Sequence, residues 1–86
     1  MPEISRFFGI IIRMYFDDHQ PPHFHGIYGT HEAQIGINPI RVLRGSLPRR
    51  VESMVIEWTA LHQQELMQNW HRLENDQPAE AIEPLE

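Results

Sequence analysis

The hydrophobic residues of this 86-residue chain change their spacing near Leu47, and this change constrains the fold more than any other feature. Before it, apolar residues alternate with other residues over short stretches, which is typical of strands. After it, apolar residues recur at the spacing of a helix that buries one face. These residues are Val51, Met54, Val55, Trp58, Leu61, Leu66 and Leu73. The pattern predicts an α+β protein, with a small antiparallel sheet of three to four strands packed against a long or bent C-terminal helix.

The first half divides into short strands separated by turn residues. Residues 6–16 predict a first strand, residues 23–28 a second and residues 31–37 a third, and residues 41–44 would add a short fourth. A two-residue turn at Gly29 and Thr30 would join the second strand to the third, because glycine commonly opens such turns. The sheet is therefore expected to occupy about residues 6–44.

The second half predicts helical structure over residues 47–75. A straight helix of this length would extend roughly 42 Å, whereas a domain of this size has a radius of gyration of roughly 12 Å. We therefore expect either an overhanging helix or a bend near residues 59–61. Residues 76–86 are predicted to form a loose polar tail, which Ile82 and Leu85 would hold down if they packed.

The bulk composition limits the possible classes of protein. A chain of this length predicts one domain, residues 1–86, of marginal stability. Because it has no cysteine, neither a disulfide nor thiolate-bound zinc adds stability, and a homodimer or a partner protein would be the source of any such help. No segment predicts a membrane span or a signal peptide, so a cytoplasmic location is expected. The net charge is −5, with six arginines in residues 1–50 and eight acids in residues 51–86.

The segment from His19 to His25 contains three of the six histidines, two of them directly after a double proline. The prolines oppose a helix there. On an extended chain, alternation directs His23 and His25 to the same side. Imidazoles serve proteins both in proton transfer near neutral pH and in metal binding.

The predicted turn also assigns the faces of the sheet. It pairs Phe24 with Ile35 on an apolar face that should lie under the helix, because directly opposed residues share a face. Matching the apolar face of the first strand to this core places the opposite face of that strand beside the histidines. The result is a polar cluster on the sheet face away from the helix. Its predicted members are Arg13, Tyr15, His23, His25, Glu32 and Gln34.

This cluster favours two chemistries and one structural alternative. His23 and His25 could act as general acid and base, with Arg13 stabilising a phosphorane-like charge and Tyr15 orienting it, as in a metal-independent ribonuclease. Glu32 and Gln34 would then contact the substrate or a partner. The structural alternative is a polar outer face with no chemistry.

A metal site is the second chemistry. His19, His23 and His25 would supply three nitrogen ligands, with Glu32 or Asp18 as an oxygen ligand. Glu32 lies further from His25 than in the first metal motif of cupins, and the chain is too short for their two-motif barrel. We therefore expect no cofactor, and the metal remains the alternative.

Two further features suggest binding surfaces. The first is a group of arginines where the sheet meets the helix. These arginines could bind RNA phosphates or an acidic segment of a partner, or they could be ordinary solvated surface. These are Arg41, Arg44, Arg49 and Arg50. The second is Trp70, which falls beside the apolar stripe of the helix and is a candidate for a partner interface.

Several segments together resemble a bacterial family known as domain of unknown function 4160. They are Met1 to Ile10, Met14-Tyr15-Phe16, His19 to His25, Gly45 to Arg50, Glu57-Trp58, Leu61-His62, Asn69-Trp70 and Ile82 to Leu85. The resemblance covers essentially the whole chain. It implies a partner protein of domain-of-unknown-function family 2442, encoded beside this one. It also implies that this chain is the toxin of a type II toxin–antitoxin pair. It implies no catalytic residues. The alternative is a non-catalytic protein-binding or regulatory module.

Overall fold

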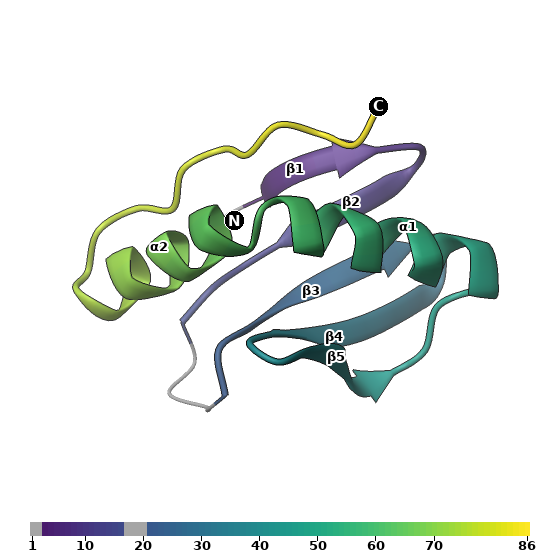
Figure 1. Ribbon diagram of the computed structural model, residues 1–86, viewed down its shortest axis with the longest axis horizontal. Coiled ribbons are helices and arrows are strands. Elements are labelled where there is room, and N and C mark those ends of the chain that lie inside the picture. The colour runs from purple at the N-terminus through teal and green to yellow at the C-terminus, as the bar shows by residue number, and fades with distance from the viewer. Residues whose placement is uncertain (1–2, 17–20) are drawn as a thin grey trace.

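The computed structural model describes residues 3–16 and 21–86, which form one antiparallel sheet and two helices (Figure 1). The sheet has five strands in the order β1-β2-β3-β4-β5. The strands are β1 (Glu3–Phe7), β2 (Ile10–Arg13), β3 (His23–Tyr28), β4 (His31–Ile37) and β5 (Ile40–Gly45), and the helices are α1 (Arg49–Leu61) and α2 (Gln63–Glu74). The α+β prediction is confirmed, and the three to four expected strands become five.

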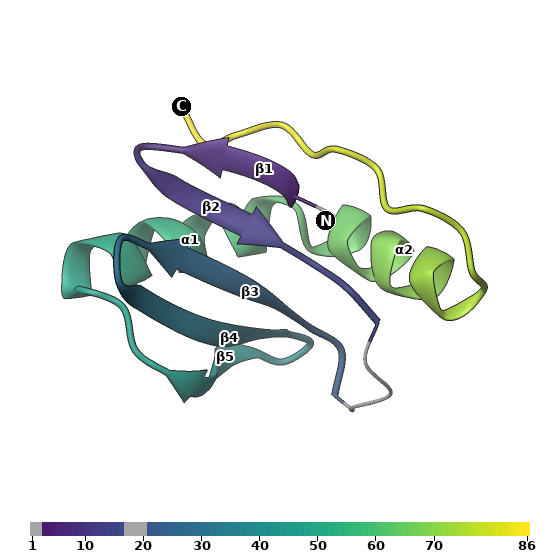
Figure 2. The same ribbon diagram turned by 180° about the vertical axis from the view of Figure 1, so that it is seen from behind.

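Both helices lie against the same face of the sheet (Figure 1), and the view from behind shows the other face without a helix over it (Figure 2). The core fills the space between the two layers. Its fully buried aromatic side chains include Phe24, which packs edge-on against Trp58 with ring centroids 5.7 Å apart. Burial of large apolar side chains is the main stabilising contribution to folding. One layer of helix on one layer of sheet therefore leaves the second sheet face to the polar residues.

The prediction of one continuous first strand is wrong. A tight turn at Phe8 and Gly9 divides this segment into β1 and β2. Both residues have positive φ angles, 51° and 79°, as the type I′ hairpin turn requires. The turn shifts the alternation, so Phe7 is buried against Trp58 whereas Phe8 is 60% exposed. Alternation along one continuous strand over residues 6–16 predicted Phe8 on the buried face with Ile10 and Ile12, and the turn overturns that prediction.

The hairpin of β3 and β4 agrees with the prediction in both bounds and register. Tyr28 is paired with His31, and Phe24 with Ile35. The predicted apolar face is buried at Phe24, Ala33, Ile35 and Ile37, whereas Tyr28 at the end of the strand is 37% exposed. Alternation together with a glycine turn was sufficient to predict this part of the fold.

The helical half contains a break rather than one long helix. The α1 helix ends at Leu61, and His62 (φ −120°, ψ 25°) separates it from α2. The expected bend is confirmed one residue beyond the predicted segment. The break allows Trp58 of α1 and Trp70 of α2 both to reach the interior, where they are 0% and 1% exposed. None of the helices in the described part of the chain combines the length and the apolar character needed to cross a membrane.

The C-terminal segment has no regular structure but is held in place, so the loose tail is wrong and the alternative of an anchored tail is confirmed. It runs beside α2 and β1 (Figure 1). The backbone N–H of Ile82 donates to the carbonyl of Ile4 at 2.8 Å, and the indole of Trp58 donates to the carbonyl of Glu83 at 2.8 Å. Ile82 is 5% exposed, and Leu85 packs against the core.

Candidate functional site

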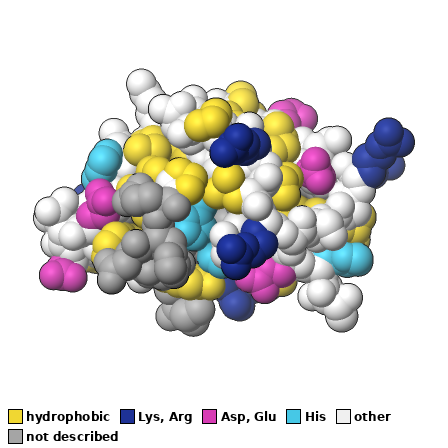
Figure 3. Space-filling view, turned by 90° about the horizontal axis from the view of Figure 1, so that it is seen from below, with side chains coloured by type: hydrophobic (Ala, Val, Ile, Leu, Met, Phe, Trp, Pro, Cys, Tyr) yellow, Lys and Arg dark blue, Asp and Glu magenta, His cyan; other side chains and the backbone are white. Residues whose placement is uncertain are grey.

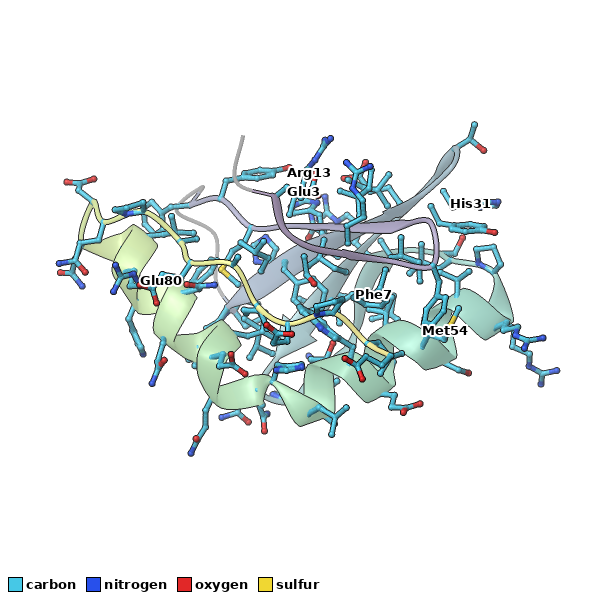
Figure 4. All side chains as sticks on the ribbon, turned by 90° about the horizontal axis from the view of Figure 1, so that it is seen from above. Glu3, Phe7, Arg13, His31, Met54 and Glu80 are labelled. Carbon is cyan, nitrogen blue, oxygen red and sulfur yellow. The ribbon has the colours of Figure 1, made fainter. Side chains whose placement is uncertain are left out.

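A row of polar residues crosses all five strands at one level of the sheet. Successive pairings connect Glu3 to Arg13, Arg13 to His25, His25 to Gln34, and Gln34 to Arg44. Because directly opposed residues share a face, all five side chains lie on the same face. Figure 4 shows Glu3 and Arg13 on the side of the sheet away from the helices, whereas Phe7 and Met54 lie on the helix side. The predicted placement of Arg13, His25 and Gln34 on one face is confirmed.

His25 lies at the centre of this row and has two specific contacts. Its Nδ1 lies 3.0 Å from Glu32 Oε2, and its ring stacks on Tyr15 with centroids 4.8 Å apart. Because a carboxylate only accepts hydrogen bonds, Nδ1–H of His25 donates to Glu32. This contact fixes the tautomer and directs the lone pair of a neutral imidazole to Nε2. Glu32 thus orients the His25 ring, as the acidic member of a catalytic triad orients its histidine.

His23 occupies the end of β3 and connects this face to α2. Its Nδ1–H donates to the carbonyl of Pro21 at 2.9 Å, which fixes the same tautomer as in His25. The His23 ring lies 5.5 Å from the His25 ring and 5.3 Å from the Trp70 ring, and Trp70 lies 6.0 Å from Phe16. Five rings therefore form a continuous series of contacts from Tyr15 to Phe16.

The sequence led us to expect exposed histidines, and that expectation is wrong: the series of rings covers them. His23 and His25 are only 3% and 6% exposed. Tyr15 covers one side of His25, and Trp70 contacts His23 at the place where β2 has ended and β3 begins. Trp70 is 1% exposed, so the expectation that it serves a partner interface is wrong: its surface is already used within the chain. No local pattern in the sequence connects Trp70 to the histidine segment.

Three of the buried polar atoms at this site have no hydrogen-bond partner among the residues that the structure describes. They are Nε2 of His25, Nε of Arg13 and Nε1 of Trp70. A buried polar group without a partner costs about 1–3 kcal/mol. The first two atoms belong to directly paired residues on β3 and β2, one an acceptor and the other a donor. Once uncovered, this pairing would offer complementary contacts to a ligand that carries both oxygen acceptors and hydroxyl donors.

A shallow pocket of about 200 Å³ lies at the β5 end of the row, lined by Glu32, Ala33, Gln34, Arg44 and Gly45. Glu32 therefore contacts His25 and borders this pocket as well. The other predicted arginines, Arg41, Arg49 and Arg50, are exposed, as a binding surface requires. The predicted roles of all these residues in binding or catalysis remain predictions.

The alternative metal site cannot be assembled from the described residues. His19 lies outside them, as do Asp17 and Asp18. Within residues 3–16 and 21–86, no group of three or more His, Cys, Asp or Glu side chains gathers as a metal would require. The pair of His25 and Glu32 has the hydrogen-bonded geometry of an acid–base group instead.

At the β1 end of the row, the Glu3 carboxylate forms a bidentate ion pair with the Arg6 guanidinium, with N···O distances of 2.9 and 2.8 Å. This hydrogen bond to Arg6 is the main reason that the pKa of Glu3 lies below its ordinary value of 4.5. We expect Arg6→Gln to raise the pKa of Glu3, as followed by NMR titration of its side chain. Because the native pKa is lowered, the stabilisation is present at neutral pH and is lost as the pH falls through that pKa.

The same variant should leave the stability at neutral pH almost unchanged, because exposed ion pairs contribute little. Arg72→Gln serves as the control, since Arg72 lies on α2 and should leave the Glu3 titration as it is. An unchanged pKa of Glu3 in Arg6→Gln would show that the ion pair does not persist in solution.

Together these features define a class: an α+β protein whose five-stranded open sheet carries a hydrogen-bonded histidine–glutamate pair on the face opposite its helices. The family model described as "Domain of unknown function (DUF4160)" matches residues 9–71, and the chain belongs to this family. The resemblance found in the sequence is therefore confirmed. No curated protein and no solved structure matches the chain.

Proposed function

We propose that this protein is the toxin-like component of a bacterial toxin–antitoxin pair and that it acts on RNA through the helix-free face of its sheet. The observation that carries the RNA proposal is the pairing of Arg13 with His25 on that face, next to Tyr15. Guanidinium groups bind phosphates, and aromatic rings stack on unpaired bases. Single-stranded RNA supplies both phosphates and unpaired bases. A sheet face with no helix over it also gives room for an extended RNA strand.

In this proposal His25 is the general base and Glu32 the group that orients it. With Nδ1–H committed to Glu32, Nε2 of His25 is the atom that would accept the proton of an RNA 2′-hydroxyl. Arg13, paired with His25 across the strands, would stabilise the negative charge that develops on the phosphate. His23, in its doubly protonated form, would donate a proton to the leaving oxygen. The arrangement needs no cofactor.

The second candidate function is a non-catalytic binding module, and the burial of the rings favours it. Both imidazoles are largely hidden, and Nε2 of His25 has essentially no accessible surface. A general base must come within hydrogen-bond reach of its proton, so catalysis would require the rings to be uncovered when substrate binds. Binding by Arg13 and Tyr15, which are half-buried, requires no such change.

Binding and cleavage are tested separately. We expect the protein to bind fluorescein-labelled polyuridine in fluorescence anisotropy, and Arg13→Gln to weaken this binding about tenfold and to reduce the salt slope by about 1. Arg72→Gln is the matched control, because it removes one arginine from α2. Equal losses in both variants would mean that RNA contacts the protein only through its overall charge.

Cleavage of bulk cellular RNA, with and without chelator, distinguishes the two functions. We expect chelator-insensitive cleavage that falls about 10²-fold or more in His25→Gln and Glu32→Gln. Circular dichroism must show that each variant still folds, since both histidines are buried. Cleavage that chelator abolishes would favour the metal site. Binding without cleavage would contradict the catalytic roles and leave the binding module.

The toxin–antitoxin setting has its own test. Expression of the chain alone in bacteria is expected to slow growth, and coexpression of an adjacently encoded protein of family 2442 is expected to restore it. His23→Ala and His25→Ala should abolish growth inhibition, provided that the variants accumulate as folded protein. Normal growth with abundant wild-type protein would contradict the toxin proposal.

A further inference from the structure

The two outer strands of the sheet differ in how their free edges are covered. At β1, the C-terminal segment contacts the strand, since Ile82 N–H donates to the carbonyl of Ile4. At β5, the order of strands ends with no neighbour on the outer side. An uncovered edge presents backbone N–H and C=O groups that another extended chain can pair with. Within the described residues, β5 is the outer strand whose free edge receives no hydrogen bond from another segment.

A bulge in β5 places two arginines on the same face of this edge. Gln34 is paired with Arg44 and Gly36 with Arg41, and the register shifts between these pairs. Arg41 and Arg44 are three positions apart, so regular alternation would have put them on opposite faces. The shift adds one residue and brings both side chains to the helix-free face. Val42, paired with the buried Ile35, packs toward the core instead.

The arginines of β5 and of the start of α1 have no acidic partner among the described residues. In the part of the chain that the structure describes, none of Arg41, Arg44, Arg49 and Arg50 forms an ion pair. Arg49 and Arg50 open α1, only a short loop after β5. Figure 3 shows arginine side chains in dark blue on the side of the molecule where β5 lies. The edge that is free to pair is therefore also positively charged.

We propose that β5 docks an acidic, extended segment of another protein as a sixth strand of the sheet. The unpaired backbone of an edge strand selects a polypeptide rather than RNA, because the spacing of its donors and acceptors matches another strand. The charges select an acidic partner. A second copy of this chain is disfavoured, because two β5 strands side by side would bring arginines together. This docking surface is separate from the Arg13–His25 pair of the proposed RNA site.

The geometry also specifies the pattern of the partner. Residues directly opposed across strands share a face. Acidic residues of the docked strand would therefore face Arg41 and Arg44, and the intervening apolar residues would lie beside Val42. A synthetic peptide that alternates glutamate with valine has this pattern, and a peptide that alternates lysine with valine is its charge-reversed control.

Binding is measured by NMR titration of the full-length protein with each peptide. We expect the glutamate–valine peptide to bind and to shift the backbone amides of β5, and the lysine–valine peptide not to bind. The double variant Arg41→Glu, Arg44→Glu should weaken binding at least about tenfold. Arg13→Gln should not change it. That result keeps this test independent of the proposed RNA site.

N-methylated peptides test for strand pairing itself. Methylating alternate amides removes the donors on one edge of the peptide and leaves its charge intact. We expect one of the two alternate sets to abolish binding and the other to preserve it. Charged and bulged edges also prevent pairing in many sheets, and that role predicts that neither peptide binds. That result would overturn the proposal, as would equal effects of the two methylation sets. The proposal would also be overturned if the peptide shifted amides outside β5 while polyuridine bound at β5 in competition with it.

Discussion

Replacing Gly45 with alanine is expected to lower the free energy of unfolding by roughly 3 kcal/mol or more. The φ angle of Gly45 is +78°, a region that costs an L-residue roughly 1–2 kcal/mol. A Cβ at this position would also overlap the backbone carbonyl of Glu32 and lie 3.1 Å from the Cα of Ala33. Backbone atoms cannot move aside as a side chain can, and overpacking costs typically about 1–3 kcal/mol more. Urea denaturation measures the change.

Gly29→Ala is the matched control, because it separates conformation from overlap. Gly29 also has a positive φ, +60°, but a Cβ there would meet nothing within 4 Å. We therefore expect only the conformational cost, roughly 1–2 kcal/mol. Equal losses in the two variants would mean that β5 moves freely away from β4. Such movement would also loosen the pocket between Glu32 and Arg44.

Removing residues 79–86 is expected to destabilise the protein by roughly 4.5–6 kcal/mol. The deletion removes the burial of Ile82, which is 5% exposed, worth about 1.5–3 kcal/mol. It also removes the carbonyl that accepts from Trp58, and both hydrogen bonds between Asn69 and Glu80, each worth about 1 kcal/mol. For a domain of this size we expect the melting temperature to fall by roughly 15 °C or more.

Two point variants divide this effect between side chain and backbone. Ile82→Ala should cost about 2 kcal/mol or more, because it empties a buried position. Glu83→Ala should cost almost nothing, since Trp58 bonds to the main-chain carbonyl of Glu83 and not to its side chain. If the shortened protein had the same melting temperature as the full-length chain, the C-terminal segment would not be docked in solution.

Local spacing was enough to predict the centre of the sheet. The glycine at position 29 and the alternation on either side of it specify the pairing of Phe24 with Ile35, because a one-residue slip would expose the apolar set. The same reasoning placed Arg13 and Tyr15 on the histidine side. It did not predict the turn at Phe8, because phenylalanine is not a residue type that indicates a turn, although Phe8 adopts a positive φ. The break at His62 was predicted only approximately, from the length of the helical segment and not from the residues at the break itself.

The chain's spacing thus determined which residues share the face of His25, whereas only the tertiary structure decided how much water reaches them. Side-chain direction follows from backbone periodicity, which is local. Burial depends on what packs against a position, and here the covering groups come from distant segments: Tyr15 on His25, and Trp70 on His23. The anchoring of the C-terminal segment has the same origin, because its partners Trp58 and Asn69 belong to two different helices that are distant from it in sequence.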